Sequence, residues 1–400
     1  MHATYMTTRY RSRNPGSQTA LRQSNQQRII TSLVSGGPST QAEISRNTGL
    51  SNATVSNIVK ALAERGIVST APTTSSGRRA LSVSLSGENG AVAVGIDFGR
   101  RHVRVLVAGL DYQVIASEAV ELPLGHSASV ALDAASRLLA SVLESSGVSP
   151  SLVLGIGVGI PGPIDRRSET VIEGAILPEW VGITHAQIEA RLNYPVYIDN
   201  DANLGALAEV TWGPHSGTDN LVFVKIGSGI GAGLIFNGLP FGGNIGVTGE
   251  IGHTPVHDHG LLCRCGNRGC LETVASTTVM IELLSRTSPT TVATTDIVRA
   301  ALAGDHATLR IIEDAGLAVG RSVAAIVNLV NPAIVVIGGP LAGLGELLLD
   351  PVRRGLNVYA VPMLSETTEL VMSSLGEQAE ALGASALVLR QTGLLSPLPL

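Results

Sequence analysis

The feature that most constrains this chain is a cluster of metal-ligand residues between positions 250 and 272. All three cysteines, Cys263, Cys265 and Cys270, fall within eight residues, and His253 lies ten residues before the first of them. Three thiolates and one imidazole complete a tetrahedral zinc shell and leave no open position for catalysis. The spacing therefore predicts a structural zinc site held by His253, Cys263, Cys265 and Cys270. The alternative is three buried cysteines without a metal.

Length and composition favour a cytoplasmic α/β protein of several folding units. A chain of 400 residues is expected to form two or three such units, and an apolar share of 44% with only 3% aromatic residues suits closely packed helices and strands. The N-terminus lacks the apolar segment of a secretory signal. The longest uncharged run, residues 322–345, is interrupted by Asn, Pro and paired Gly residues, so we predict no membrane span.

Charge is distributed unevenly along the chain. Residues 1–87 carry ten basic and two acidic side chains, a balance of +8, whereas the remainder carries 17 basic and 30 acidic side chains, a balance of −13. A basic module on an acidic body is typical of a segment that meets a polyanion such as DNA. The first 22 residues are polar, rich in Arg and without periodicity, and we predict a flexible basic arm there.

Residues 23–87 have the pattern of a winged helix-turn-helix. Apolar residues at helical spacing begin near Asn25 and end at the turn of residues 36–38. Ser39 or Thr40 is expected to cap a second helix that ends at Gly49, and Ser51 is expected to cap a third. Two short helices joined by a glycine-containing turn indicate a helix-turn-helix, and residues 67–71 and 81–85 indicate a β-hairpin wing.

The third helix would present small polar side chains to the edges of DNA bases, and the wing would present arginines. The predicted DNA-binding residues are Ser51, Asn52, Ala53, Thr54, Ser56, Asn57 and Lys60 on the helix, with Arg78 and Arg79 at the tip of the wing. The partner would be double-stranded DNA. The alternative is a helical protein-interaction module with a solvated basic face.

From residue 90 the pattern changes to three β-rich runs, residues 91–99, 102–110 and 112–122, which predict an antiparallel meander. A later strand, residues 196–199, delivers Asn200 and Asp201 to the start of a helix. These side chains either point into a cleft at the sheet edge or cap the helix. The glycine run of residues 227–233 either approaches phosphate or forms a strained hairpin.

With these pieces in place, the chain resembles the ROK family of repressors and sugar kinases, in its regulator branch. The motifs that carry the resemblance are EIGH at residues 250–253, CRCGNRGCLE at 263–272, NDAN at 200–203 and GIPGP at 159–163, and it extends over residues 25–392. The resemblance implies a two-lobed actin-like fold of the ribonuclease H-like ATPase and sugar kinase type for residues 90–394. One lobe would comprise residues 90–200 with 376–394, and the other residues 201–375.

The resemblance also implies a site for a sugar or sugar phosphate between the lobes. Carried over position by position, the sugar-contacting residues are Asn200, Asp201, Glu250, His253 and Glu272, all able to bond hydroxyl groups. His253 would give one ring nitrogen to zinc and the other to the sugar. In the kinases of the family the residue at Asp201 is the catalytic general base.

The departures from the kinase pattern argue against catalysis. Kinases of the family have D-x-G-G-T after the first strand, where this chain has Asp97 followed by Phe, Gly, Arg100 and Arg101. Ile176 also replaces the usual Asn before Leu-Pro. Bulky side chains at the phosphate turn predict weak or lost ATP binding. Arg100 and Arg101 either point to solvent or meet the phosphate of a phosphorylated sugar.

These observations predict a sugar-responsive DNA-binding regulator, a repressor of carbohydrate metabolism genes, that is not an enzyme and forms a homodimer or homotetramer. One alternative is an active ATP-dependent sugar kinase with an appended DNA-binding domain, in which Asp201 would be catalytic. A zinc-stabilised scaffold is a third possibility, but it explains neither the segment at residues 200–203 nor the wing.

Overall fold

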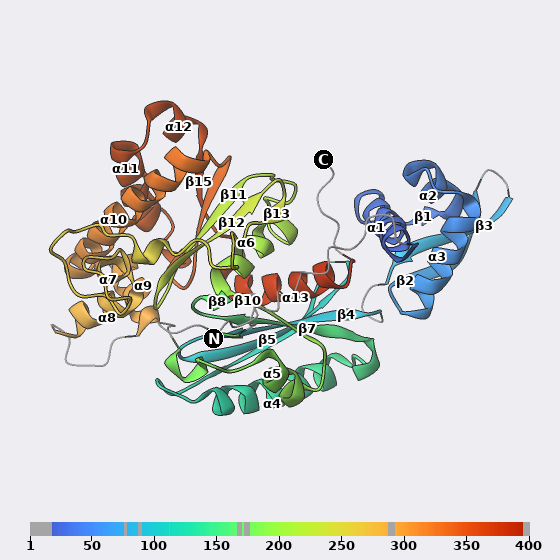
Figure 1. Ribbon diagram of the computed structural model, residues 1–400, viewed down its shortest axis with the longest axis horizontal. Coiled ribbons are helices and arrows are strands. Elements are labelled where there is room, and N and C mark those ends of the chain that lie inside the picture. The colour runs from blue at the N-terminus through green and yellow to red at the C-terminus, as the bar shows by residue number, and fades with distance from the viewer. Residues whose placement is uncertain are drawn as a thin grey trace, which may run out of the picture.

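The computed structural model describes residues 18–75, 78–86, 90–111, 113–165, 170–171, 177–286 and 293–394. Within these ranges the chain forms a small N-terminal unit and a body of two lobes, each built on a five-stranded mixed sheet (Figure 1). The predicted fold class is confirmed: a winged helix-turn-helix precedes a two-lobed α/β body. None of the helices in the described ranges has the length and apolar character needed to cross a membrane.

The N-terminal unit is a winged helix-turn-helix. Its elements are α1 (Gln18–Gly36), β1 (Ser39–Thr40), α2 (Gln41–Thr48), α3 (Asn52–Glu64), β2 (Val68–Ser75) and β3 (Arg78–Leu85). Thr40 forms a capping box with Glu43 at the start of α2, and Ser51 accepts a hydrogen bond from the Thr54 N–H at the start of α3. Gly49, with φ of 67°, ends α2 in the left-handed conformation. These local signals explain why both helices were predictable.

Two boundaries differ from the sequence prediction. Helix α1 begins at Gln18, so residues 18–22, which were predicted to belong to the flexible arm, are helical. This segment contains Ala, Leu and Arg, which favour helix, but it has no apolar stripe, so periodicity missed it. In the wing, Arg78 and Arg79 were predicted at the tip of a loop, whereas they open β3 opposite β2. Residues 1–17 and 76–77 lie outside the described ranges.

The first lobe contains the predicted meander. Its sheet has the order β10-β7-β4-β5-β6, with β4 (Val92–Phe98), β5 (His102–Gly109), β6 (Val114–Glu121), β7 (Val153–Ile160) and β10 (Val196–Asn200). Two short strands, β8 (Ile164–Asp165) and β9 (Thr170–Val171), follow β7. Helices α4 (Ala128–Ser146) and α5 (His185–Leu192) cover one face, below the sheet in Figure 1. Strand β4 is buried along its whole length because both faces of the sheet are covered.

The second lobe carries the metal-ligand segment and the glycine run. Its sheet has the order β13-β12-β11-β14-β15, with β11 (Leu221–Ile226), β12 (Ile230–Phe236), β13 (Leu239–Pro240), β14 (Ile334–Gly338) and β15 (Glu369–Met372). Its helices are α7 (Glu272–Ala275), α8 (Thr277–Ser285), α9 (Thr294–Leu302), α10 (His306–Val330), α11 (Glu346–Tyr359) and α12 (Pro362–Thr367). The glycine run is only partly a turn, because β12 already begins at Ile230.

Two helices fill the space between the sheets. Helix α6 (Asp201–Thr211) packs against β11 and β12, and α13 (Ala379–Gln391) packs against β4 and β7; the two helices also pack against each other. Glycines permit this close approach. A Cβ atom on Gly383 of α13 would lie 1.8 Å from the Leu204 carbonyl oxygen of α6, and a Cβ atom on Gly95 of β4 would lie 1.8 Å from the Ala381 oxygen. Helix α13 is therefore fixed against both lobes.

The far end of α13 joins the winged helix to the body. Val388 and Leu389 belong to the same buried apolar cluster as Ile30 of α1 and Ile67 before the wing. The Ala91 N–H donates a hydrogen bond to the Gly66 carbonyl oxygen (2.8 Å), so the backbone at the start of the body is bonded to the turn before the wing. The winged helix is thus attached to the body by a shared apolar core in addition to the connecting chain.

Candidate functional site

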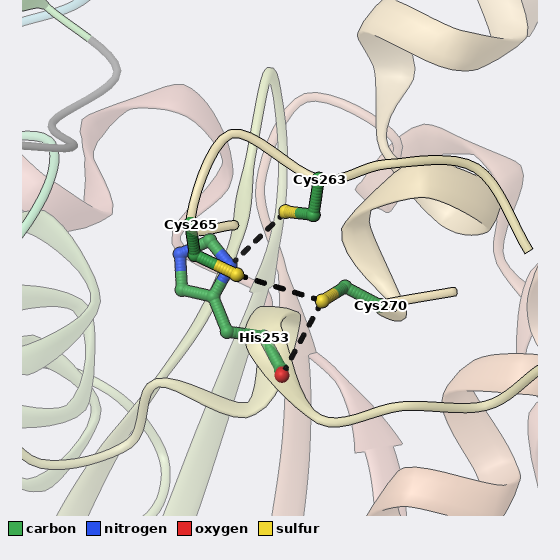
Figure 2. Close-up of side chains that lie close together, drawn as sticks. All are labelled: His253, Cys263, Cys265 and Cys270. Carbon is green, nitrogen blue, oxygen red and sulfur yellow. Dashed lines mark hydrogen bonds between the residues drawn. The ribbon is translucent and has the colours of Figure 1, made fainter. Parts of the chain in front are cut away.

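The four predicted metal ligands meet at one point in the structure. The donor atoms of His253, Cys263, Cys265 and Cys270 all lie within 4.8 Å of one another, although they come from separate turns of the segment (Figure 2). The Cys263 Sγ lies 3.5 Å from His253 Nδ1, and the Cys265 and Cys270 Sγ atoms are 3.7 Å apart. In a tetrahedral zinc site, Zn–S and Zn–N bond lengths require S···S separations of about 3.8 Å and S···N separations of about 3.6 Å. The donor set therefore fits a tetrahedral metal ion.

Local backbone bonds shape this cluster. The Cys263 N–H donates to the Asn267 oxygen (2.7 Å), and the Leu271 N–H donates to the Thr254 oxygen (2.9 Å). Burial and the neighbouring thiols raise the pKa of Cys270 to about 12. Burial also raises the pKa of Cys263, so these two buried thiols hold their protons unless a cation stabilises the thiolates. The cluster is thus arranged for a metal ion.

Beside the cluster, three carboxylates face one another. The His253 Nε2 atom, on the ring side opposite the sulfurs, lies 3.8 Å from Glu250 Oε2. Burial, with the nearby carboxylates of Asp201 and Glu272, raises the pKa of Glu250 to about 7. Glu272 is already engaged: its Oε2 accepts hydrogen bonds from Arg264 Nη2 (2.9 Å) and from the Ile230 N–H (3.4 Å). Four of the five predicted sugar residues thus lie together next to the metal-ligand cluster.

Asn200, the fifth predicted sugar residue, uses its side chain for structural hydrogen bonds. Its Oδ1 accepts hydrogen bonds from the N–H groups of Ala202 (2.8 Å) and Asn203 (3.4 Å), which makes it the cap of α6. Its Nδ2 donates to the Gly162 oxygen (2.7 Å) in the GIPGP segment. Of the two alternatives for this position, the structure has the helix cap. The amide fixes the loop that precedes the site.

Asp201 is bound on both oxygens. Its Oδ1 accepts from the Ala202 N–H (2.9 Å), and its Oδ2 accepts from Lys225 Nζ (2.8 Å). The Lys225 Nζ also lies 3.0 Å from Glu380 Oε1. Sequence reasoning missed Lys225 and Glu380. A signal for Lys225 was present, because it is one of only two lysines and lies two residues before the glycine run. Glu380 lies in an Ala-rich helix and offers none.

At the phosphate turn the two arginines differ. Arg101 is exposed, whereas Arg100 is half-buried and reaches across to the other lobe. Its Nη1 donates to Thr278 Oγ1 (3.3 Å), which in turn donates to the Ser228 oxygen in the glycine run (2.9 Å). Arg100 therefore links the two turns that would hold phosphates in a kinase. Ile176, the other departure from the kinase pattern, lies outside the described residues.

The predicted DNA-contacting residues divide into two groups. Exposed side chains line one side of α3, and Arg79 is exposed on β3; the exposed positions on the helix are Asn52, Ala53, Ser56, Asn57 and Lys60. Ser51 and Thr54 are instead tied to each other, with their hydroxyl oxygens 2.8 Å apart at the helix cap. The side chain of Arg78 is outside the described part of the structure. The exposed positions on α3 carry small or polar side chains and one lysine.

Comparison with known proteins assigns the chain to a family. Residues 93–391 match the ROK family, and residues 22–79 match a domain of unknown function, DUF7343. The chain is 29% identical over 390 residues to the xylose repressor of Caldicellulosiruptor bescii, covering 94% of this chain and 97% of the repressor. It is 33% identical over 276 residues to the glucokinase of Thermotoga maritima, covering 65% of this chain and 86% of the glucokinase.

Among solved structures, a ROK family transcriptional regulator homologous to the Escherichia coli MLC protein superimposes with a TM-score of 0.77. The sequence identity is 24%, and the match covers 94% of this chain and 98% of the regulator. That similarity supports the fold, including the position of a winged helix ahead of a two-lobed body. Because the family match spans most of the chain, the protein belongs to the ROK family.

Proposed function

We propose that this protein is a sugar-responsive, DNA-binding transcription regulator that represses genes of carbohydrate metabolism. The observation that carries the proposal is the attachment of a winged helix to α13, whose other end reaches the candidate sugar site. A full-length relationship to a xylose repressor supports it, whereas the glucokinase relationship covers a smaller part of the chain. Residues 23–87 would bind DNA, and residues 90–394 would bind the sugar.

The sugar site is proposed to consist of Asp201, Glu250, His253 and Glu272, with Asn200 holding the adjoining loop. Carboxylates accept hydrogen bonds from pairs of hydroxyl groups, so this set can distinguish sugar stereochemistry. Arg100 and Arg264 lie beside it, and their guanidinium groups would suit a sugar phosphate. A binding screen that pairs each sugar with its phosphate distinguishes the two ligand types.

Zinc is the metal that the donor set favours, because three thiolates and one imidazole suit Zn²⁺ and fill its tetrahedral shell. His253, Cys263, Cys265 and Cys270 would hold it, and its chemistry would be structural. By fixing the ring of His253, the ion would hold Nε2 toward the sugar and shape the segment that carries Glu250 and Glu272.

DNA would be read by α3 in the major groove. The side chains proposed for base contacts are Asn52, Ala53, Ser56 and Asn57, whereas Lys60, Arg78 and Arg79 would contact phosphates. Ser51 and Thr54 are proposed to act through the helix cap. Helix α13 is the proposed route of response: Glu380 lies at one end beside Lys225, and Leu389 lies at the other end in the core of the winged helix.

Helix-turn-helix regulators bind paired half-sites, so we infer a homodimer or homotetramer. Exposed apolar side chains gather where α10, α11 and α12 meet; they are Leu329, Val358, Tyr359, Val361 and Met363. Asn328 ties this region together, because it bonds both the Tyr359 oxygen and the Val361 N–H. Such a surface suits association with a second copy of the chain. A regulator of this kind would work in the cytoplasm, where the chromosome is.

The alternative function, ATP-dependent sugar phosphorylation, is opposed by Arg100 and by the engagement of Asp201 with Lys225. A coupled ATPase assay over hexoses, pentoses and amino sugars tests it directly. The regulator proposal expects no turnover above background. Robust turnover that disappears in Asp201→Asn would establish the kinase instead, whatever the chain does with DNA.

The regulator proposal is tested by selecting genomic DNA fragments with the purified full-length protein. We expect enrichment of a limited set of sites upstream of carbohydrate genes, and loss of that enrichment in Asn57→Ala combined with Ser56→Ala. Glu64, at the end of the same helix, offers a matched exposed control, since Glu64→Ala should leave the enrichment intact. Equal recovery of all fragments by the full-length protein would overturn the proposal.

A further inference from the structure

A buried cluster of three carboxylates surrounds a single ammonium group at the junction of the lobes. The carboxylates belong to Asp97 on β4, Asp201 on α6 and Glu380 on α13, and the ammonium group belongs to Lys225 on β11. The Lys225 Nζ lies 2.8 Å from Asp201 Oδ2 and 3.0 Å from Glu380 Oε1. Four separate elements therefore deliver one charge each to the same point.

The three carboxylates are more than a surface acidic patch. Asp97 and Glu380 are only 2% and 4% exposed. Asp97 Oδ2 pairs with His102 Nε2 at 2.8 Å, but its buried Oδ1 has no hydrogen-bond partner among the described residues. Glu380 Oε1 likewise makes a close ionic contact with Lys225 without a directed hydrogen bond. Two carboxylate oxygens therefore lack a hydrogen bond in a site that is largely shielded from water. Burying unpaired carboxylates in this way destabilises the fold unless a cation is present.

The surrounding carboxylates keep Lys225 positively charged. Burial disfavours its ammonium form, but the carboxylates of Asp201, Glu380 and Asp97 outweigh that effect and raise the pKa of Lys225. Burial also disfavours the ionised form of Asp97, but a hydrogen bond from His102 and the positive charges of Lys225 and Arg104 outweigh that effect and lower the pKa of Asp97. The lysine is therefore a permanent positive charge at the centre of the cluster.

We propose that the Lys225 ammonium group is a tethered cation that occupies the place of a divalent metal ion among Asp97, Asp201 and Glu380. Carboxylate oxygens from several elements are the ligands that Mg²⁺ and Mn²⁺ prefer. Lysine delivers a fixed charge to such a site without depending on metal concentration. The residues present do not fit a magnesium nucleotide, because Asp201 and Glu380, which could meet its metal, already hold Lys225, and Asp97 is paired with His102.

With Lys225 in this place, Asp201 lacks a free oxygen for general-base chemistry. A general base must accept a proton from the substrate, whereas Asp201 Oδ2 is held by Lys225 and Oδ1 by the backbone of α6. The cluster therefore serves as a fixed wall of the site and leaves Glu250 as the carboxylate that can adapt to a ligand. Lys225 acts as a positioning residue, since it works through Asp201 and Glu380.

The test measures how much Mn²⁺ the zinc-loaded, full-length protein binds. The electron paramagnetic resonance signal of the free ion gives the amount that remains unbound. Lys225→Ser removes the ammonium group and opens space, so this variant should bind about one Mn²⁺ per chain more than the parent protein. Lys225→Met removes the charge but keeps the volume, so it should bind no more than the parent and measures the surface background. Lys225→Ser combined with Glu380→Gln should lose the additional ion.

A folded Lys225→Ser protein without additional Mn²⁺ would overturn the proposal, as would an equal gain in Lys225→Met. If the serine variant does not fold in metal-free buffer, its refolding yield with Mg²⁺ is compared with the yield in Na⁺ at matched ionic strength. Recovery with Mg²⁺ alone supports the proposal, and no recovery contradicts it. These measurements use neither DNA nor sugar, so their failure would leave the proposed regulatory function standing.

Discussion

Replacing Gly383 by Ala tests how tightly α13 is held between the lobes. The new Cβ atom would lie 1.8 Å from the Leu204 carbonyl oxygen, whereas ordinary contact begins at 3.4 Å. The helices must therefore separate by about 1.6 Å, and the obstacle is backbone, which cannot rotate away. Overpacking of this kind costs roughly 1–3 kcal/mol and sometimes more, while Ala in a helix gains about 1 kcal/mol over Gly. Because the obstacle is backbone, we expect a cost at the upper end of that range, about 3 kcal/mol, and hence a net loss of about 2 kcal/mol.

The assay is urea unfolding of the full-length protein followed by circular dichroism. Gly36 provides the matched control, because it ends a helix with φ outside the positive range and a Cβ atom there would meet nothing within 4 Å. Gly36→Ala should leave the unfolding midpoint unchanged or raise it, whereas Gly383→Ala should lower it. A Gly383→Ala protein as stable as the parent, or an equal loss of stability in the two variants, would refute the tight packing of α13 against α6.

Three further predictions concern the metal, a buried acid and the DNA face. Cys270→Ser should reduce bound zinc well below the parent content and cost stability, as seen by metal analysis and thermal unfolding; a full zinc content would contradict the ligand assignment. Burial raises the pKa of Glu209 above 4.5, so the native state favours its protonated form and loses stability as pH rises from 4.5 through the native pKa. As the pH rises above 4.5, the unfolding free energy of Glu209→Gln should therefore increasingly exceed that of the parent. A difference that stays constant with pH would refute this. Lys60→Ala should lower the salt dependence of DNA binding by about one unit of slope without changing the preferred sequence, and an unchanged slope would place Lys60 away from the phosphates.

Features whose residues lie close together in the sequence were predictable. The metal ligands fall between His253 and Cys270, and the caps of α2 and α3 use residues three apart. The first strands of the body were predictable for the same reason, because their apolar runs are continuous. Local chemistry of this kind does not depend on the rest of the fold.

Features that depend on distant segments were not predictable. Lys225 pairs with Asp201, 24 residues before it, and with Glu380 from the last helix. No spacing rule connects these positions, and only the packing of α13 against α6 brings them together. Asn200 shows a different limit: its residue type suits both a cap and a ligand contact, and only the geometry of the helix start separates the two. The reach of Arg100 across the lobes likewise depends on tertiary structure.

In the proposed function, a sugar bound beside the metal cluster changes how the winged helix binds DNA. The most direct measurement is fluorescence anisotropy of the full-length protein on a selected genomic fragment, with xylose, glucose, N-acetylglucosamine and their phosphates added in turn. We expect one of these compounds to change the DNA affinity by about tenfold or more, and Glu250→Gln to abolish that change while DNA binding persists. An affinity for DNA that stays constant in the presence of every compound shown by calorimetry to bind would contradict the account.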